Sequence, residues 1–216
     1  MELDLNGWQG AAAPEAVTLD GNYVRLEPLD AGRHAAAIWR AVQGADEVWD
    51  YLFDGPYAEE AEFTAAIAVK AAGTSARFWA ILPEYGEAAG YASLMRMDTA
   101  HGVIEVGNIL YSPRLQRTRA ATEAMYLLAG YVFEQLGYRR YEWKCNAENL
   151  PSRKAAERLG FRFEGIFRQH MVAKGKNRDT AWFAMLDHEW PERSAAFERW
   201  LEPRNFDGEG RQLSNL

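Results

Sequence analysis

The sequence predicts a single α/β domain in which helices flank a mixed sheet of about seven strands. Segments with the two-residue periodicity of strands alternate along the chain with segments of helical periodicity. The chain has 216 residues, of which 48% are hydrophobic and 25% are charged, and this balance suits one globular domain with a sizeable core. Glycine and proline separate the segments, and no internal repeat or low-complexity tract stands out.

The domain is expected to begin with one strand and two helices. Residues 1–20 are mixed in composition and are expected to form a loosely ordered arm. Tyr23–Glu27 alternates apolar and charged residues, as a half-buried strand does. Asp30 can cap a helix that runs to Val42, and a second helix is expected over Glu59–Ala71. This early helical pair is expected to cover the sheet as a flap.

A meander of three strands follows, over Phe78–Leu82, Ala88–Met97 and Val103–Ser112. Turns that contain glycine join these strands, so the sheet is expected to be mostly antiparallel. A long helix is expected over Arg119–Leu136, because apolar residues recur at helical spacing and Gly137 can end it.

The rest of the chain alternates again between strands and helices. The expected elements are a strand over Arg140–Asn146, a helix from its cap Asn149 to Leu159, strands over Phe161–Ala173 and Arg178–Leu186, and a helix over Pro191–Leu201. The domain is therefore expected to span residues 21–188. Residues 1–20 form the arm, and residues 189–216 form the last helix and a polar tail.

Composition narrows the choice of partners and location. The formal net charge of −7 and the pI near 5.2 argue against nucleic acid, and they fit a cationic or amine substrate slightly better than an anionic one. Cys145 is the single cysteine, so an internal disulfide is impossible and a reducing cytoplasm is the natural location. The N-terminus lacks signal-peptide features, and no apolar stretch approaches the ~20 residues that span a bilayer. We expect a cytoplasmic protein without a membrane, nucleic-acid or metal partner.

A candidate anion site lies where the third strand of the meander leads into the long helix. The loop after Tyr111 is rich in small and basic residues, and the helix that follows aims free N–H groups and a partial positive charge at one point. A pyrophosphate fits such a site, and Arg114, Arg117 and Arg119 add charge. The alternative is a basic loop that only caps a structural helix.

Two motifs resemble the GNAT N-acetyltransferase superfamily, in the branch that includes the ribosomal-protein N-terminal acetyltransferases. The phosphate loop of that superfamily reads Gln/Arg-x-x-Gly-x-Gly/Ala, and Gln116-x-x-Arg119-x-Ala121 is its counterpart, with arginine at the first glycine position. The second motif is Lys144-Cys145-Asn146-x-x-Asn149-x-x-Ser152-x-x-x-Ala156-x-x-Leu159-Gly160-Phe161. Residues 21–188 follow the order of elements in the superfamily.

The resemblance implies acetyl-CoA as the donor and a sheet splayed at its centre to admit acyl-CoA. Gly107 suits the strand bulge that splays the two strands. The resemblance places the following residues around the cofactor: Ile109, Leu110, Tyr111, Gln116, Arg117, Thr118, Arg119, Ala120, Ala121, Asn149 and Ser152.

Proton-transfer groups also follow from the resemblance. Ser152 is expected to donate a proton to the leaving thiolate, from a first helical turn whose dipole favours negative charge. Glu105 is the first candidate for the general base, with His170 and Glu164 as alternatives, although His170 could lie on the outer face of the sheet. The structural alternatives are a helix cap for Asn149 and an arginine partner for Glu105. Cys145 is expected to be a buried strand residue and no nucleophile.

The segment from Asp46 to Tyr57 is rich in aromatic and acidic residues and is expected over the substrate mouth. Trp49, Tyr51 and Phe53 could line an amine pocket, and Asp54 or Asp50 could pair with a cation; a turn that covers the core is the alternative. Near the end of the domain, Arg178 and Asp179 are expected to form a structural ion pair.

The sequence thus predicts an N-acetyltransferase in which the amine attacks acetyl-CoA directly within a ternary complex. The substrate is a small amine, an amino acid or an antibiotic, and the protein is a monomer or a homodimer. Two alternatives stay open: an acetyltransferase for protein N-termini, and a sensor that binds acyl-CoA without catalysis.

Overall fold

The structure is a computed structural model that describes residues 5–216. Its strands are β1 (Leu19–Asp20), β2 (Val24–Pro28), β3 (Ala76–Pro83), β4 (Gly90–Asp98), β5 (Val103–Tyr111), β6 (Arg140–Asn146), β7 (Arg162–Ala173) and β8 (Lys176–Leu186). Its α-helices are α1 (Ala31–Val42), α2 (Glu60–Ala72), α3 (Arg119–Gly130), α4 (Leu150–Arg158) and α5 (Trp190–Leu201). The shorter helical turns are η1 (Asp46–Trp49), η3 (Asp187–Glu189) and η4 (Pro203–Asn205), and a π-helical turn, η2 (Tyr131–Gln135), extends α3.

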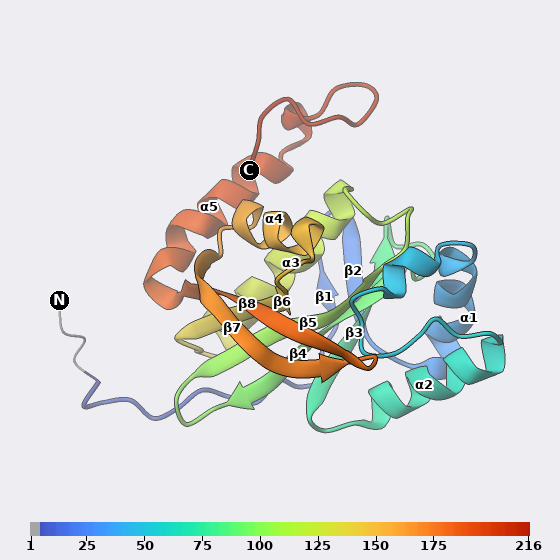
Figure 1. The fold of residues 1–216 in the computed structure, drawn as a ribbon. Helices are drawn as coiled ribbons and strands as arrows, with labels where there is room; N and C mark the ends of the chain where they lie inside the picture. Colours follow the sequence, from blue (N-terminus) through green and yellow to red (C-terminus); the bar gives the residue numbers. More distant parts are fainter. Residues whose placement is uncertain (1–4) are drawn as a thin grey trace.

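One mixed sheet organises the molecule, with strand order β1-β2-β3-β4-β5-β6-β8-β7 (Figure 1). All neighbouring strands are antiparallel except β5 and β6. The predicted mixed, mostly antiparallel sheet flanked by helices is therefore confirmed. The two predicted helix caps form as well, since Asp30 accepts a hydrogen bond from the Arg33 amide and Asn149 accepts one from the Ser152 amide.

The sheet has eight strands because the end of the N-terminal arm joins it. Leu19 in β1 pairs with Leu26 in β2, and the Trp79 indole donates a hydrogen bond to the carbonyl oxygen of Val17. The part of the arm that the structure describes is thus packed against the domain. The sequence alone did not reveal this strand of two residues.

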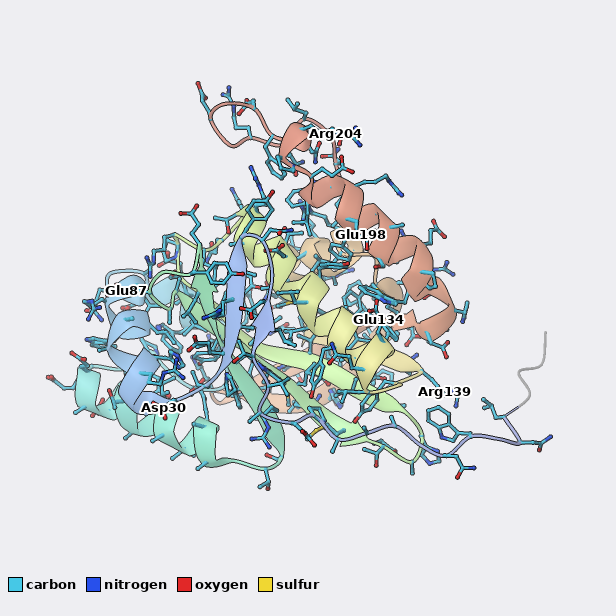
Figure 2. All side chains as sticks on the ribbon, turned by 180° about the vertical axis from the view of Figure 1, so that it is seen from behind. Asp30, Glu87, Glu134, Arg139, Glu198 and Arg204 are labelled. Carbon is cyan, nitrogen blue, oxygen red and sulfur yellow. The ribbon has the colours of Figure 1, made fainter. Side chains whose placement is uncertain are left out.

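Two hydrophobic clusters fill the space between the sheet and its helices. Helices α3, α4 and α5 cover one face, and Figure 2 shows α3 lying across that face beside α5, where Glu198 is labelled. Helices α1 and α2 cover the other face, through Ile38 and Phe63 packed on Phe78 and Tyr91. These two helices pack on β3 and β4, so the face of β5, β6 and β8 on that side carries polar side chains instead.

Strands β5 and β6 separate at the centre of the sheet. They pair in parallel over four residue pairs, and Val106 with Trp143 is the last of these. Within β5, a bulge opposite β4 contains Asn108, whose φ of 49° is left-handed. The predicted splay is present, but the left-handed residue of the bulge is Asn108 and not Gly107. A Cβ on Gly107 would lie 2.8 Å from the Met95 sulfur, so glycine there permits a close approach.

The C-terminal segment, predicted as a polar tail, folds back on itself after α5. Phe206 pairs with Gln212 in a β-bridge, and its ring packs edge-on against Trp200 with 5.0 Å between ring centroids. Asn205 is buried and hydrogen-bonds both the Trp200 carbonyl and Ser214. Among residues 5–216, no helix is both long and apolar enough to cross a membrane.

Candidate active site

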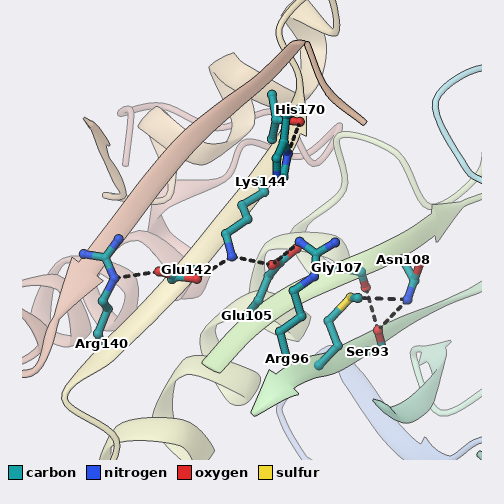
Figure 3. Close-up of polar contacts among 11 residues, drawn as sticks. Ser93, Arg96, Glu105, Gly107, Asn108, Arg140, Glu142, Lys144 and His170 are labelled. Carbon is teal, nitrogen blue, oxygen red and sulfur yellow. Dashed lines mark hydrogen bonds and ion pairs between the residues drawn. The ribbon is translucent and has the colours of Figure 1, made fainter. Parts of the chain in front are cut away.

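A buried charge cluster lies where β5 and β6 separate (Figure 3). Lys144 Nζ lies 2.9 Å from Glu105 Oε2 and 2.6 Å from Glu142 Oε2, and each of these three side chains is at most 8% exposed. Arg96 Nη1 also reaches Glu105 Oε2, at 2.9 Å, and Arg140 Nε lies 2.7 Å from Glu142 Oε1. The cluster occupies the sheet face that carries α1 and α2, beyond the strands those helices cover.

Glu105 keeps one carboxylate oxygen clear of its two cationic partners. Lys144 and Arg96 both contact Oε2, whereas Oε1 makes no hydrogen bond within residues 5–216. A Cβ on Gly107 would lie 3.3 Å from Oε1, so this oxygen lies beside Gly107, where the strands begin to separate. The predicted partnership with an arginine is present, and it leaves Oε1 able to accept a proton.

Glu164 lies in an ion pair at the other end of the cluster. Its two oxygens contact the two terminal nitrogens of Arg140, at 2.8 and 2.5 Å. The hydrogen bonds from Arg140 hold the pKa of Glu164 below its usual value. Because Arg140 engages both oxygens, Glu164 lacks the free oxygen that Glu105 retains and is poorly placed to serve as a base.

The loop between β5 and α3 offers free amides to an anion. Thr118 caps α3 by accepting a hydrogen bond from the Ala121 amide. Within residues 5–216, no acceptor is bonded to the amides of Arg117, Arg119 or Ala120. Alanine at position 120 has a small side chain, which would let a ligand come close to the backbone. The site suits a phosphate group, since free amides and a helix dipole converge there.

The three arginines of this loop have different roles. Arg114 donates to the carbonyl oxygens of Glu87 and Ala88, and so holds the loop against the turn before β4. The Arg119 guanidinium lies between two aromatic rings, 4.4 Å from the Tyr23 centroid and 3.6 Å from the Phe206 centroid. Arg117 is exposed, has a left-handed φ of 61°, and makes no ion pair within the described chain. Only Arg117 is thus uncommitted and able to neutralise a phosphate.

Three further residues predicted around the cofactor lie on β5, beyond its last pair with β6. Leu110 packs in the core beside α1 and α2, whereas Ile109 and Tyr111 pack toward α3. This change of face follows from the extra residue in the β5 bulge. Tyr111 donates its hydroxyl to the Ala121 carbonyl, and the Gln116 amide donates to the Tyr111 carbonyl. Side chains of the strand and the loop therefore hold each other in place.

Ser152 lies on the opposite face of the sheet from the charge cluster. It is in the first turn of α4, and its Oγ accepts a hydrogen bond from Trp143 Nε1 at 3.0 Å. Asn149 uses its Oδ1 to cap the helix, so the structural role that we considered for it is present. Burial raises the pKa of the neighbouring Cys145 thiol, although a contact with Ser152 opposes this shift. A neutral, buried thiol is a poor nucleophile.

His170 is exposed and lies on the same side of the sheet as the charge cluster, where it contacts Thr180 (Figure 3). Between Phe167 and Met171, β7 has three residues opposite one in β8, and this bulge turns His170 toward Thr180. The His170 Nδ1 atom lies 3.0 Å from Thr180 Oγ1. Burial lowers the pKa of His170, and the charges of nearby arginines and Lys144 lower it further. The imidazole is therefore neutral near pH 7.

The aromatic segment divides between core and surface. Trp49 is 2% exposed and its ring packs edge-on against Tyr57 and Phe63, so its predicted place in a pocket wall is wrong. Asp54 accepts hydrogen bonds from Lys70 and Tyr57. The cation that pairs with Asp54 is therefore Lys70 of the protein and not a substrate amine.

Tyr51 and Phe53 remain exposed and available to a ligand. Tyr51 reaches the Glu148 carbonyl in the loop before α4 at 3.4 Å, and the Phe53 ring centroid lies 5.0 Å from Arg178 Cζ. Lys174, at the tip of the β7–β8 hairpin, donates to the carbonyl oxygens of Trp49 and Gly55. The hairpin and the aromatic segment thus enclose one side of the opening.

The predicted ion pair between Arg178 and Asp179 is wrong. Consecutive strand residues point to opposite faces of a sheet. Asp179 accepts hydrogen bonds from the Gln169 amide and from Asn177, whereas Arg178 makes no ion pair within residues 5–216. The cluster of Arg96, Lys144 and Glu142 was not predicted from the sequence, although alternating charges at Arg140, Glu142 and Lys144 were a usable signal of one charged strand face.

Comparison with known proteins identifies the family. Residues 24–162 match the family model of the acetyltransferase (GNAT) domain. The crystal structure of a GCN5-related N-acetyltransferase from Brucella melitensis is 49% identical, with a TM-score of 0.95, and the match covers 98% of this chain and 97% of that one. The uncharacterised N-acetyltransferase p20 of Bacillus licheniformis is 33% identical over 118 residues, which are 55% of this chain and 66% of that protein. The chain belongs to the GNAT acetyltransferase family, and it is an N-acetyltransferase.

Proposed function

We propose that this protein transfers the acetyl group of acetyl-CoA to the primary amine of a small molecule, within a ternary complex. The observation that carries the proposal is the opening between β5 and β6, which leads from the free amides of the α3 loop to the charge cluster. A ligand that spans this opening can meet donors for phosphate at one end and proton-transfer groups at the other. Acetyl-CoA supplies the acetyl group as a thioester, which an amine can attack directly.

The cofactor side of the site is formed by the α3 loop and β5. The amides of Arg117, Arg119 and Ala120 and the Arg117 guanidinium would bind the pyrophosphate. Arginine at the usual glycine position is compatible with this role, because the Arg119 side chain turns away onto Tyr23 and Phe206. The backbone of Ile109 and Tyr111, on the unpaired side of β5, would bind the pantetheine amides.

The two proton transfers, from the amine and to the thiolate, would take place on opposite faces of the sheet. On the α4 face, the Ser152 hydroxyl accepts from Trp143 and would donate its own proton to the departing thiolate. On the opposite face, Glu105 Oε1 would accept the proton of the attacking amine, while Lys144 and Arg96 hold the carboxylate in position. His170 is the competing acceptor, because it is neutral and lies on the same side of the sheet as the cluster.

A small substrate is favoured over a protein N-terminus. Lys174 ties the tip of the β7–β8 hairpin to the segment that carries Tyr51 and Phe53, and this contact narrows the approach from the substrate side. A protein N-terminus would require the hairpin to move. The two classes of substrate are distinguished by the mass of the acetylated product.

Turnover of acetyl-CoA with a mixed panel of amines tests the proposal. Release of free thiol that depends on an amine, together with a product heavier by one acetyl group, is the expected result. Binding of acetyl-CoA without thiol release from any amine or peptide would indicate the sensor instead. A melting temperature unchanged by saturating acetyl-CoA would contradict the cofactor assignment itself, because a ligand of the native state raises it.

A further inference from the structure

Arg178 is a buried cation without a carboxylate partner. Its residue is 7% exposed, and its Nε atom is enclosed without a hydrogen bond. Its terminal nitrogens make no hydrogen bond or ion pair within residues 5–216 either. Buried charges in proteins are normally paired, because an isolated ion loses its hydration without compensation. This unpaired guanidinium therefore requires an explanation.

The nearby carboxylates are all engaged by other cations. Glu105 is held by Arg96 and Lys144, and Glu142 by Lys144 and Arg140. Burial lowers the pKa of Arg178 and repulsion from Arg96 adds to this shift, whereas Cys145 and Glu105 oppose it. The charge cluster thus leaves Arg178 without a carboxylate in direct contact.

Arg178 lies on the substrate side of the opening between β5 and β6. Arg178 and Thr180 are two residues apart in β8, so their side chains lie on the same face of the sheet. Thr180 in turn contacts His170. The exposed Phe53 ring covers one side of the guanidinium, with 5.0 Å between Cζ and the ring centroid. Because Nε is enclosed, the two terminal nitrogens are the atoms that can meet a ligand. A guanidinium with one covered side and two free donors matches a planar carboxylate.

We infer that Arg178 binds a carboxylate of the amine substrate, so that the substrate is an amino acid or another small amine that also carries a carboxylate. This inference rests on the proposed function, since it names the substrate class of the same site. It reverses the slight preference for a cationic substrate that the net charge of −7 suggests, because the field at the site is set by nearby groups.

Matched amine pairs test the inference. The probes are tyrosine with tyramine, histidine with histamine, and phenylalanine with phenethylamine, each assayed by thiol release from acetyl-CoA in buffer of low chloride content. We expect at least one acid to exceed its decarboxylated partner in kcat/KM. Arg178→Met should lower kcat/KM for that acid by roughly 10- to 100-fold, the size of a hydrogen-bonded charge contact, and should change the decarboxylated amine little.

Two controls separate binding of a carboxylate from a general structural effect. Arg168→Met removes an exposed arginine from the adjacent strand and should leave every rate unchanged. Arg178→Lys keeps the charge and should recover part of the preference for the acid. Each variant is used only if its melting temperature lies above the assay temperature and its affinity for acetyl-CoA is measured in parallel. An affinity for acetyl-CoA that falls as much as the rate would overturn the inference, because Arg178 would then serve the cofactor.

The remaining outcomes distinguish this inference from the proposed function. Faster acetylation of the decarboxylated amines, or an equal loss for both members of a pair in Arg178→Met, overturns the inference and leaves the acetyltransferase intact. The same acids are also titrated by calorimetry into the protein saturated with CoA. Binding of an acid that requires Arg178, without thiol release from any amine, supports the inference and counts against the proposed function. If none of the acids binds in this titration, the inference is overturned.

Discussion

Lys144 and Glu105 join β6 to β5 at the point beyond which the two strands separate, with 2.9 Å between Nζ and Oε2 and each side chain 5% exposed. The ion pair fixes the position of a carboxylate whose second oxygen faces the opening. Lys144 also contacts Glu142, and its ammonium lies 3.9 Å from the centroid of the Trp182 ring. The stability of the sheet and the proposed catalysis thus both depend on the buried Glu105 carboxylate.

Glu105→Gln should affect both activity and stability. The amide cannot accept the proton of the amine, so kcat should fall by roughly 100-fold, at the low end of general base catalysis. The loss should be smaller at high pH, where more of the amine is already neutral. Because Lys144 and Arg96 lose a charged partner, the free energy of unfolding should fall by about 1.5–3 kcal/mol. Glu164→Gln, in a partly exposed ion pair with Arg140, is the control in urea titrations and should cost less than about 1 kcal/mol.

His170→Gln separates the two candidate bases through the pH dependence of the rate. The pKa of His170 is lowered, so the side chain is neutral near pH 7 and gains a proton only as the pH falls through that lowered value. If Glu105 is the base, the variant should keep most of its rate at pH 7. The rate of the variant should also decline less steeply toward acid pH, because glutamine does not gain the positive charge that His170 gains there. His101→Gln, in an exposed turn, is the control. A large loss at pH 7 in His170→Gln, with Glu105→Gln nearly unaffected, would assign the base to His170.

Ser152→Ala should lower kcat by roughly 100-fold and leave the affinity for acetyl-CoA nearly unchanged, because a donor to the thiolate acts mainly in the transition state. Single-turnover kinetics and calorimetry measure the two quantities. Cys145→Ala is a neighbouring control and should retain activity, because its buried thiol has a raised pKa. An equal rate in Ser152→Ala and wild type would require another donor to the sulfur.

Substitution of two arginines in the α3 loop tests the proposed cofactor site. Arg117→Ala should weaken acetyl-CoA binding by roughly tenfold, with a larger effect at low salt, because a charged contact to phosphate is lost. Arg119→Ala should leave the affinity nearly unchanged and lower the melting temperature, since its cation–π contacts with Tyr23 and Phe206 contribute about 0.5–2 kcal/mol. If calorimetry instead shows weaker acetyl-CoA binding in Arg119→Ala and unchanged binding in Arg117→Ala, Arg119 and not Arg117 binds the phosphate.

Asp54→Asn should make stability less dependent on acid pH. Burial alone would raise the pKa of Asp54, but hydrogen bonds from Lys70 and Tyr57 outweigh it, and the pKa is lowered. The carboxylate therefore stabilises the native state above its unfolded pKa, and this contribution is lost as the pH falls through the lower folded value. The variant should be less stable by roughly 1 kcal/mol at pH 7 and should approach wild type in acid. Exposed Asp50→Asn is the control, and a constant difference at all pH values would contradict the argument.

Most of the fold could be predicted because its signals are local. Asp30 and Asn149 cap helices from the positions that the sequence indicates, since capping needs only neighbouring residues. β1 could not be predicted, because two residues show no periodicity and the strand exists only through its pairing with β2. A bulge was predicted at Gly107, but its left-handed residue is Asn108, because that backbone conformation is imposed by the pairing of β5 with β4.

The site was less predictable because its contacts join distant parts of the chain. Trp49 reads as a pocket aromatic in sequence, but tertiary packing buries it against Phe63. The partners of Glu105 lie on β4 and β6, so their distances depend on the whole sheet. The error at Arg178 was avoidable, because strand alternation separates it from Asp179.

The opening between β5 and β6 gives the protein an unpaired strand edge in the middle of its sheet. Exposed edges are templates for pairing with the strands of other chains, and proteins blunt them with bulges and inward-pointing charges. Asn108 supplies a bulge at this edge, and Glu105 and Lys144 supply buried charges beside it. We therefore expect Asn108, Glu105 and Lys144 to disfavour pairing of this edge with another chain, and substitutions at Glu105 or Lys144 should lower solubility as well as activity.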